Sequence, residues 1–145
     1  MRPDHGSVMS VVSLFVVLGV VVVCYVIAAQ RRGRVGVTVA TRRSDVFLPM
    51  DPAAVFARLQ QIGARYRVDD ADPATRQLVL SSPVTLFTWG FFYPVAVHPH
   101  GTAGSRIEIG IQSRLFQWGR LVNHAHVRCA EEISQWLGVP AARVA

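Results

Sequence analysis

The chain of 145 residues contains no lysine and only two cysteines. All 15 basic residues are therefore arginines, a bias that codon usage alone can produce. Cys24 lies inside an apolar block and Cys129 lies on the apolar side of a predicted helix, so the two thiols are not expected to meet. This excludes a disulfide framework and suits a reducing compartment.

The sequence also lacks the common patterns of catalytic and metal sites. It has no Cys-x-x-Cys or His-Glu-x-x-His spacing, and no serine stands in a Gly-x-Ser-x-Gly context. In an extended segment His98 and His100 would point the same way and form a candidate metal chelate, whereas His124 and His126 lie on different sides of a helix. Loop and surface positions are the simpler interpretation of two of these histidines. We predict no catalytic residue, no metal site and no cofactor.

Basic residues do not form a stripe on the predicted domain. From Val37 onward there are eleven arginines and eight acids, so half of the net charge of +6 lies before that residue. A nucleic-acid-binding face needs a concentrated basic patch. We therefore expect no nucleic-acid partner.

Residues 8–29 form an uncharged, apolar block of 22 residues. As a helix this block would be about 33 Å long, slightly more than the hydrocarbon core of a bilayer. A lone segment satisfies its backbone hydrogen bonds in lipid only as a helix, so we predict a transmembrane helix. One alternative is a buried core element, but the block is long and lacks a polar stripe. The other is a signal peptide cleaved near Ala29, but its apolar region is longer than usual.

Charges on either side of the block predict its orientation. Arg31, Arg32 and Arg34 follow the block directly, whereas Arg2 on the other side is offset by Asp4. The positive-inside rule then places the N-terminus outside and the rest of the chain in the cytoplasm, with one crossing of the cell membrane. The three arginines are expected at the membrane interface, where each contributes on the order of 1 kcal/mol beside anionic lipids.

The predicted organisation has five parts. They are an N-terminal tail at 1–7, the transmembrane helix at 8–29, a basic juxtamembrane linker at 30–36, a folded domain at 37–140 and a C-terminal tail at 141–145. The bilayer is thus the first expected partner of the chain.

Hydrophobic periodicity predicts the elements of the folded domain. Asp51 and Pro52 are typical of a helix start, and Gly63 is typical of a helix end. The predicted order is a strand over 37–41 that resumes at 46–48, a helix over 51–62, a hairpin of 66–68 and 77–80, strands over 85–97 and 106–111, and a helix over 118–137. This order predicts an α+β fold, in which two helices cover one face of an antiparallel sheet of four or five strands.

The aromatic run from Phe87 to Tyr93 is the most distinctive local pattern. In a strand its odd-numbered side chains would share one face with Val95 and Val97, namely Phe87, Trp89, Phe91 and Tyr93. Core packing beneath the helices is the main interpretation. The alternatives are the wall of an apolar pocket and a stripe that enters the bilayer. Phe92 would project from the opposite face and is the better candidate for an exposed contact.

Ser113-Arg114 at the end of the last strand, followed by Asn123 near the start of the final helix, resembles a family of small bacterial domains of unknown function. The element order over residues 45–137 is similar too. That family's turn glycine and aspartate would fall on Phe116 and Gly119, which differ in type. More distantly, the chain resembles the helix-grip lipid-binding superfamily, whose domains pair a curved antiparallel sheet with a long C-terminal helix. Both resemblances imply a fold rather than an activity.

The main functional hypothesis is a membrane-tethered, non-catalytic binding or assembly domain that docks a protein partner or an apolar ligand near the inner leaflet. The alternative is a lipid-binding module, or an enzyme, that uses the aromatic strand as a pocket wall. An open cavity between the sheet and the C-terminal helix would favour the alternative. The residues expected to contact a ligand or partner are Trp89, Phe92, Tyr93, Arg114, Trp118 and Asn123.

Overall fold

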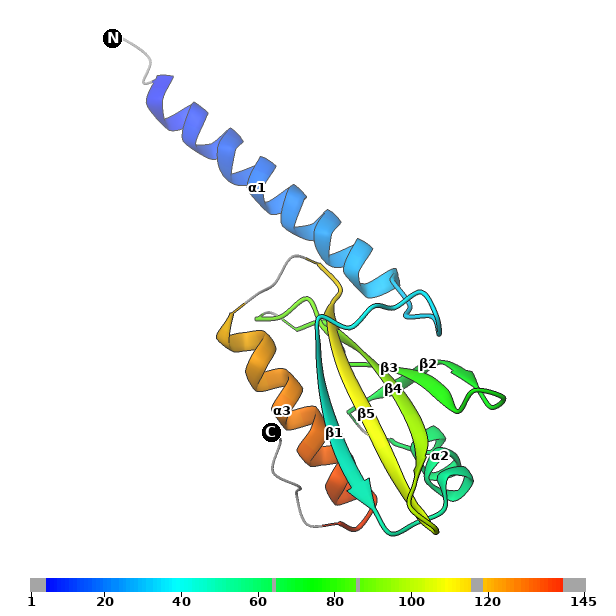
Figure 1. Ribbon diagram of the computed structural model, residues 1–145. Coiled ribbons are helices and arrows are strands. Elements are labelled where there is room, and N and C mark those ends of the chain that lie inside the picture. Colours follow the sequence, from blue (N-terminus) through cyan, green and yellow to red (C-terminus); the bar gives the residue numbers. More distant parts are fainter. Residues whose placement is uncertain (1–4, 64, 86, 116–118, 140–145) are drawn as a thin grey trace.

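The N-terminal helix α1 (His5–Gln30) projects from the folded domain as one long rod (Figure 1). The computed structural model describes residues 5–63, 65–85, 87–115 and 119–139. Within those ranges, α1 is the one helix that is long and apolar enough to cross a membrane, and its stretch Val11–Gln30 has a mean hydropathy of 3.0. Most of its side chains are exposed, which fits a helix that is apolar on all sides and has no protein core to pack against.

Five antiparallel strands form a single sheet (Figure 1). Along the chain they are β1 (Arg42–Leu48), β2 (Arg67–Asp72), β3 (Gln77–Ser81), β4 (Phe91–His100) and β5 (Gly104–Ser113). Their spatial order is β1-β5-β4-β3-β2, so β2 to β5 form a meander and β1 pairs with β5 at the far edge. Side chains alternate between two faces, and the inner face buries branched residues such as Val46, Val95 and Ile109.

Helices α2 (Pro52–Gln60) and α3 (Arg120–Trp136) share one hydrophobic core with the inner face of the sheet. The predicted cap of α2 is confirmed, because the Asp51 carboxylate accepts hydrogen bonds from the amides of Ala53 and Ala54 at 2.9 and 3.1 Å. The predicted apolar faces are buried as well, through Val55, Phe56 and Leu59 on α2 and Val122, Cys129 and Ile133 on α3. The α+β fold expected from the sequence is confirmed.

The predicted strand over 85–97 is wrong in its first half, since β4 begins at Phe91. Pro83 has no amide to donate to a strand ladder, and Gly90 adopts a φ of +76°, at which the chain turns. Between them the Thr85 amide donates to the Thr88 carbonyl at 2.8 Å and closes a turn. Phe87 consequently lies 85% exposed in a loop and does not belong to an aromatic stripe.

The predicted strand over 37–41 is also wrong. Regular pairing begins at Arg42, one residue after Thr41, whose amide donates to the Ile111 carbonyl at 2.9 Å. The Val37 and Thr38 amides donate instead to the Arg34 carbonyl, at 3.2 and 3.0 Å, and so close a turn in place of a strand ladder. An alternating valine pattern therefore does not produce a strand here, because Ala40 lies over Gly110 on the outer face of β5 and this segment does not pair along the β5 edge.

Candidate functional site

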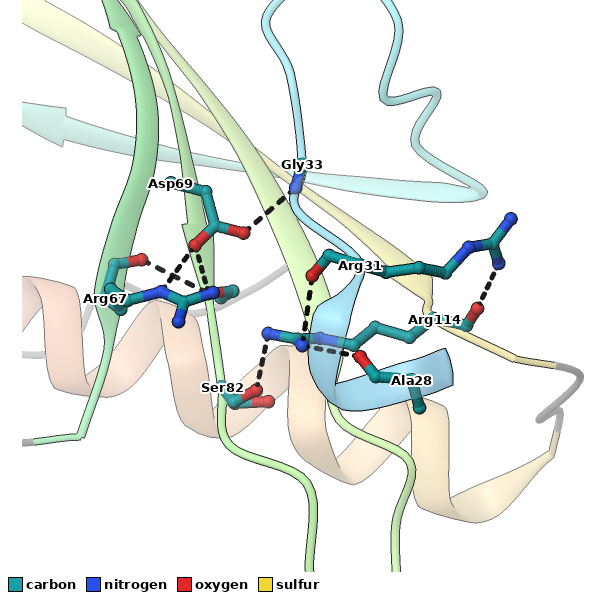
Figure 2. Close-up of polar contacts among 8 residues, drawn as sticks. Ala28, Arg31, Gly33, Arg67, Asp69, Ser82 and Arg114 are labelled. Carbon is teal, nitrogen blue, oxygen red and sulfur yellow. Dashed lines mark hydrogen bonds and ion pairs between the residues drawn. The ribbon is translucent and has the colours of Figure 1, made fainter. Parts of the chain in front are cut away.

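Arg114 joins α1 to the folded domain. It follows the last residue of β5, and its side chain is buried, with 3% exposure. Figure 2 shows its guanidinium donating from Nη1 to the carbonyls of Ala28 and Arg31, at 2.9 and 3.3 Å, and from Nη2 to the carbonyl of Ser82 at 3.1 Å. Carbonyls in the last turn of a helix have no partner within the helix and carry partial negative charge. Arg114 therefore caps the C-terminus of α1.

The ring of Phe92 packs against the guanidinium of Arg114. The guanidinium carbon of Arg114 lies 4.8 Å from the centre of the Phe92 ring, within the range of a cation–π contact. Burial lowers the pKa of the Arg114 guanidinium, and the charge of Asp69 opposes that effect. Phe92 is only 7% exposed, so its expected role as an exposed contact is wrong. It does lie on the outer face, as predicted, but the chain after α1 covers it.

Two adjacent acids of β2 hold the segment that covers the outer face. A bulge in β2 disturbs the register between Val68 and Asp70, and the carboxylates of Asp69 and Asp70 both accept linker amides. The Gly33 amide donates to Asp69 and the Val35 amide donates to Asp70, each at 2.9 Å. Figure 2 shows the first of these contacts beside the Arg114 cap. The linker is therefore docked at the point where it leaves α1.

Asp69 is the more strongly held of the two acids. Burial alone would raise the pKa of its carboxyl, but hydrogen bonds from Arg67, from the Gly33 amide and from Ser81 outweigh that effect and hold the pKa below its usual range. The Arg67 Nε and the Ser81 hydroxyl donate at 2.7 and 2.8 Å. Asp69 thus stays charged and links the linker to both strands of the hairpin.

Glycine is required where the linker passes over the sheet. A Cβ on Gly33 would lie 2.3 Å from the Val79 Cγ1, and one on Gly110 would lie 2.3 Å from the Ala40 Cβ. The backbone therefore approaches the sheet more closely than any side chain permits. As a result Val79 is buried on the outer face, where a solvated strand would normally carry a polar residue.

The strand register brings the ends of four strands together at the end of the sheet that carries α1. The pairs Phe91–Ser113, Phe92–Ser81 and Ser81–Arg67 bring together the start of β2, the end of β3, the start of β4 and the end of β5. The start of α3 lies there too, because Arg42 donates to the Asn123 side chain at 2.9 Å. We call this end of the domain the anchor end.

A pocket of about 380 Å³ opens at the anchor end between the sheet and α3, and we call it the sheet–helix pocket. Its walls combine inward-facing strand residues, the loop between β3 and β4 and the first turns of α3. Its lining comprises Arg65, Tyr66, Ser82, Pro83, Thr85, Thr88, Phe91, Tyr93, Leu121, His124, Ala125 and Arg128. The rest of the inner face is a filled core. The cavity that would favour a ligand-binding module is therefore present at this end of the sheet.

A second pocket, of about 370 Å³, lies beside the first, and we call it the anchor pocket. The end of α1 contributes Tyr25 and Ala29 to its wall. The remaining lining is Arg65, Tyr66, Arg67, Ser81, Ser82, Pro83, Val84 and Arg114. Four of these residues also line the sheet–helix pocket, so the two cavities share a wall.

Two tyrosines give the sheet–helix pocket neutral polar groups on an apolar wall. The rings of Tyr66 and Tyr93 meet edge to face, with centres 5.5 Å apart. Burial raises the pKa of both phenols, so their hydroxyls stay protonated, and the Tyr66 hydroxyl donates a hydrogen bond to the Glu132 carboxylate. At the rim, Arg65 and Arg128 both contact the Glu132 carboxylate, at 2.5 and 3.1 Å.

The structure separates the residues that the sequence singled out. Tyr93 lines the sheet–helix pocket and Arg114 lines the anchor pocket. Trp89 is half-buried in the loop before β4, Asn123 is exposed on α3, and Trp118 lies outside the described residues. Arg31, Arg32 and Arg34 are exposed just after α1.

Sequence reasoning missed the residues that complete the pockets. Tyr66 stood in a predicted hairpin arm, and Leu121 stands on α3 off the face predicted to pack on the sheet. The available signal was an apolar side chain in each of two predicted elements, but bringing the two together requires the packing of α3 against the sheet.

The histidines do not gather in one place. His100 is exposed and its ring lies 4.7 Å from that of Phe47, while His126 is buried and bonded to Ser44 and to the Ile109 carbonyl, at 3.2 and 3.0 Å. Among the described residues no group of three or more histidines, cysteines or acids is placed to hold a metal ion.

Comparison with known proteins informs the fold. No family model matches the chain, and no curated protein matches it. Among solved structures, the crystal structure of Ara h 8.0201 is similar, with a TM-score of 0.50 and 9% identity, over 66% of this chain and 93% of that one. This likeness supports the distant helix-grip resemblance at the level of fold. The resemblance to the bacterial family of unknown function is not shown.

Proposed function

We propose that this chain is a membrane-anchored, lipid-binding domain that takes the apolar part of its ligand into the sheet–helix pocket. The observation that carries the proposal is a cavity with aromatic walls, open at the anchor end of an otherwise filled core. Ligand pockets are typically concave and mostly apolar, with a few polar groups that orient the ligand. Phe91, Leu121 and Ala125 supply the apolar surface, and the Tyr66 and Tyr93 hydroxyls supply such polar groups.

Membrane anchoring by α1 is part of the proposal. Its length and hydropathy suit a span, although a signal sequence has the same properties. The contacts of Arg114 with the Ala28 and Arg31 carbonyls support a retained helix, because cleavage near Ala29 would remove one partner of a buried guanidinium. The exposed Arg31, Arg32 and Arg34 support a cytoplasmic domain and an external N-terminus.

The position of the pocket relative to the bilayer supports uptake of ligand from the membrane. The loop between β3 and β4 and the start of α3 lie at the anchor end, next to the residues at which α1 would leave the lipid. Two apolar side chains are exposed on them, Phe87 at 85% and Leu121 at 56%. Exposed apolar groups beside a membrane anchor favour contact with lipid over contact with water.

Filling the pocket tests the proposal. Ala125→Trp places an indole between α3 and the sheet, while Ala57→Trp places the same group on the exposed side of α2 and serves as the control. Native mass spectrometry of the full chain, released from nonionic detergent micelles, would count bound oleyl alcohol. We expect binding by the wild type and by Ala57→Trp, and at least a tenfold loss for Ala125→Trp. Equal binding by all three proteins would rule out this pocket.

A further inference from the structure

We infer that the ligand is an alkyl chain with a negatively charged head group, whose chain lies in the sheet–helix pocket and whose head group lies in the anchor pocket. This inference rests on the proposed function and adds the chemistry of the head group. It starts from the shared wall of the two cavities. Arg65 and Tyr66 before β2, together with Ser82 and Pro83 after β3, line both of them. One elongated molecule can therefore reach both cavities over this wall.

The two cavities differ in chemistry in the way that the two ends of an amphiphile differ. Phe91, Tyr93, Leu121 and Ala125 line only the sheet–helix pocket. Arg67, Arg114 and Ser81 line only the anchor pocket. An alkyl chain gains about 0.8 kcal/mol for each CH₂ group that it buries, and it gains this only against apolar walls. The polar head group of the same molecule then lies in the anchor pocket, which Arg67 and Arg114 line.

The charge around the cavities is positive. Arg65, Arg67, Arg114 and Arg128 line the two pockets, and neither described lining contains a carboxylate. The acids next to them are shared or already engaged, because Glu132 contacts both Arg65 and Arg128, and Asp69 contacts Arg67, Ser81 and the Gly33 amide. Four guanidinium groups therefore face two carboxylates, and an anionic head group would balance the excess.

Two of these arginines are placed to bind an incoming anion. The side chains of Arg65 and Arg67 are 50% and 55% exposed. Each guanidinium has five N–H donors, and a planar fork of two donors matches a carboxylate or a phosphate. Arg114 is buried and its two Nη atoms donate to backbone carbonyls, so it contributes charge to the pocket and leaves direct contact to the other two.

The position of the anchor pocket along α1 agrees with binding of a lipid head group. Tyr25 and Ala29, in the last turns of the apolar helix, form one side of the anchor pocket. Tyrosine side chains concentrate at the head-group level of a bilayer. If α1 spans the membrane, the anchor pocket lies where lipid head groups lie, and the sheet–helix pocket lies next to it.

Three ligands with the same alkyl chain test the head-group inference: oleate, oleyl phosphate and oleyl alcohol. Each is mixed with the full chain in nonionic detergent and counted by native mass spectrometry. For the wild type we expect both anions to bind about tenfold more tightly than the alcohol, a difference of about 1.4 kcal/mol. In the double variant Arg65→Gln with Arg67→Gln, we expect the preference for the anions over the alcohol to disappear. Arg65→Lys with Arg67→Lys keeps part of the preference, and Arg58→Gln, which lines neither pocket, keeps all of it.

The outcomes separate the two proposals. Equal binding of all three ligands by the wild type would overturn the inference on the head group and leave lipid binding intact. Binding of none of them would overturn the proposed function itself. Displacement of oleate by inorganic phosphate at a matched concentration would show a site for the free anion, and the assignment to a lipid head group would then be wrong.

Discussion

The guanidinium Nη1 of Arg114 donates a hydrogen bond to the carbonyl oxygen of Ala28 across 2.9 Å, although the two residues are 86 positions apart. In the other direction, the Arg31 side chain donates to the Arg114 carbonyl at 2.5 Å. The Arg114 side chain therefore binds the backbone at the end of α1, and the Arg31 side chain binds the backbone of Arg114. This joint fixes the direction in which α1 leaves the domain, and with it the side of the domain that would face the bilayer under the proposed anchoring.

Replacement of Arg114 by leucine should weaken this joint. The variant leaves the carbonyls of Ala28 and Ser82 without their donor, and we expect a loss of about 3 kcal/mol in the free energy of unfolding of the domain. Denaturant unfolding in detergent measures it, with limited proteolysis reporting cleavage between α1 and β1. The control Arg43→Gln removes an exposed pair with Glu108 and should cost less than about 1 kcal/mol. Equal losses for both variants would contradict the assigned role of Arg114.

Gly33→Ala should lift the linker from the sheet. Its Cβ would lie 2.3 Å from the Val79 Cγ1, so either the linker or the buried valine must move. We expect a destabilisation of about 1–3 kcal/mol, as is usual for overpacking. Adding Val79→Ala removes the clashing methyl group, so the double variant should be more stable than the sum of the single losses predicts. Gly63→Ala, whose Cβ would meet only the Gln61 carbonyl oxygen at 3.9 Å, is the control.

The stability of the docked linker should depend on pH through Asp69. Its pKa is lower in the folded chain than the ordinary value near 3.9, so its contribution is fully present above that value and is lost as the pH falls through the folded pKa. The free energy of unfolding of the wild type should therefore fall as the pH drops from about 5 through the lowered folded pKa of Asp69, and that of Asp69→Asn should fall less. Ser81→Ala, which removes one of the hydrogen bonds to Asp69, should give an intermediate slope. Identical slopes for wild type and Asp69→Asn would show that this carboxylate does not hold the linker.

Phe87 offers a test of uptake from the membrane. The side chain is 85% exposed, so Phe87→Asp should change the free energy of unfolding by less than about 0.5 kcal/mol. A charge at this position opposes contact of the loop with lipid, and we expect slower transfer of oleate from vesicles at an unchanged equilibrium affinity. Phe47→Asp changes an exposed aromatic residue packed on His100 and should leave the rate unchanged. A rate that Phe87→Asp does not alter would place this loop away from the bilayer.

Much of the fold follows from local sequence signals. The Asp51-Pro52 helix start and the apolar face of α3 depend on spacing alone, and the structure reproduces both. The aromatic run led to a wrong strand prediction before Phe91, because alternation of Phe87, Trp89, Phe91 and Tyr93 is typical of a strand. The backbone constraints of Pro83 and Gly90 prevail there and turn the first half into a loop.

The site could be predicted only in part, because its contacts are non-local. Asp69 and Asp70 fall between the two predicted hairpin arms, and only the bulge in β2 places them opposite the linker amides. Arg114 was expected to contact a ligand or partner, whereas in the structure its guanidinium caps the C-terminus of α1. Such a partner, separated by most of the chain, leaves no periodic signal in the sequence.

Photo-crosslinking tests the central claim, that an alkyl chain occupies the sheet–helix pocket, most directly. A fatty acid with a diazirine in its chain is added to the full protein in a bilayer, irradiated, and the modified peptides are mapped. The account predicts adducts on the segments that contain Phe91–Tyr93 and Leu121–Ala125, and their loss in Ala125→Trp. Adducts confined to α1, which any bilayer lipid contacts, would contradict it.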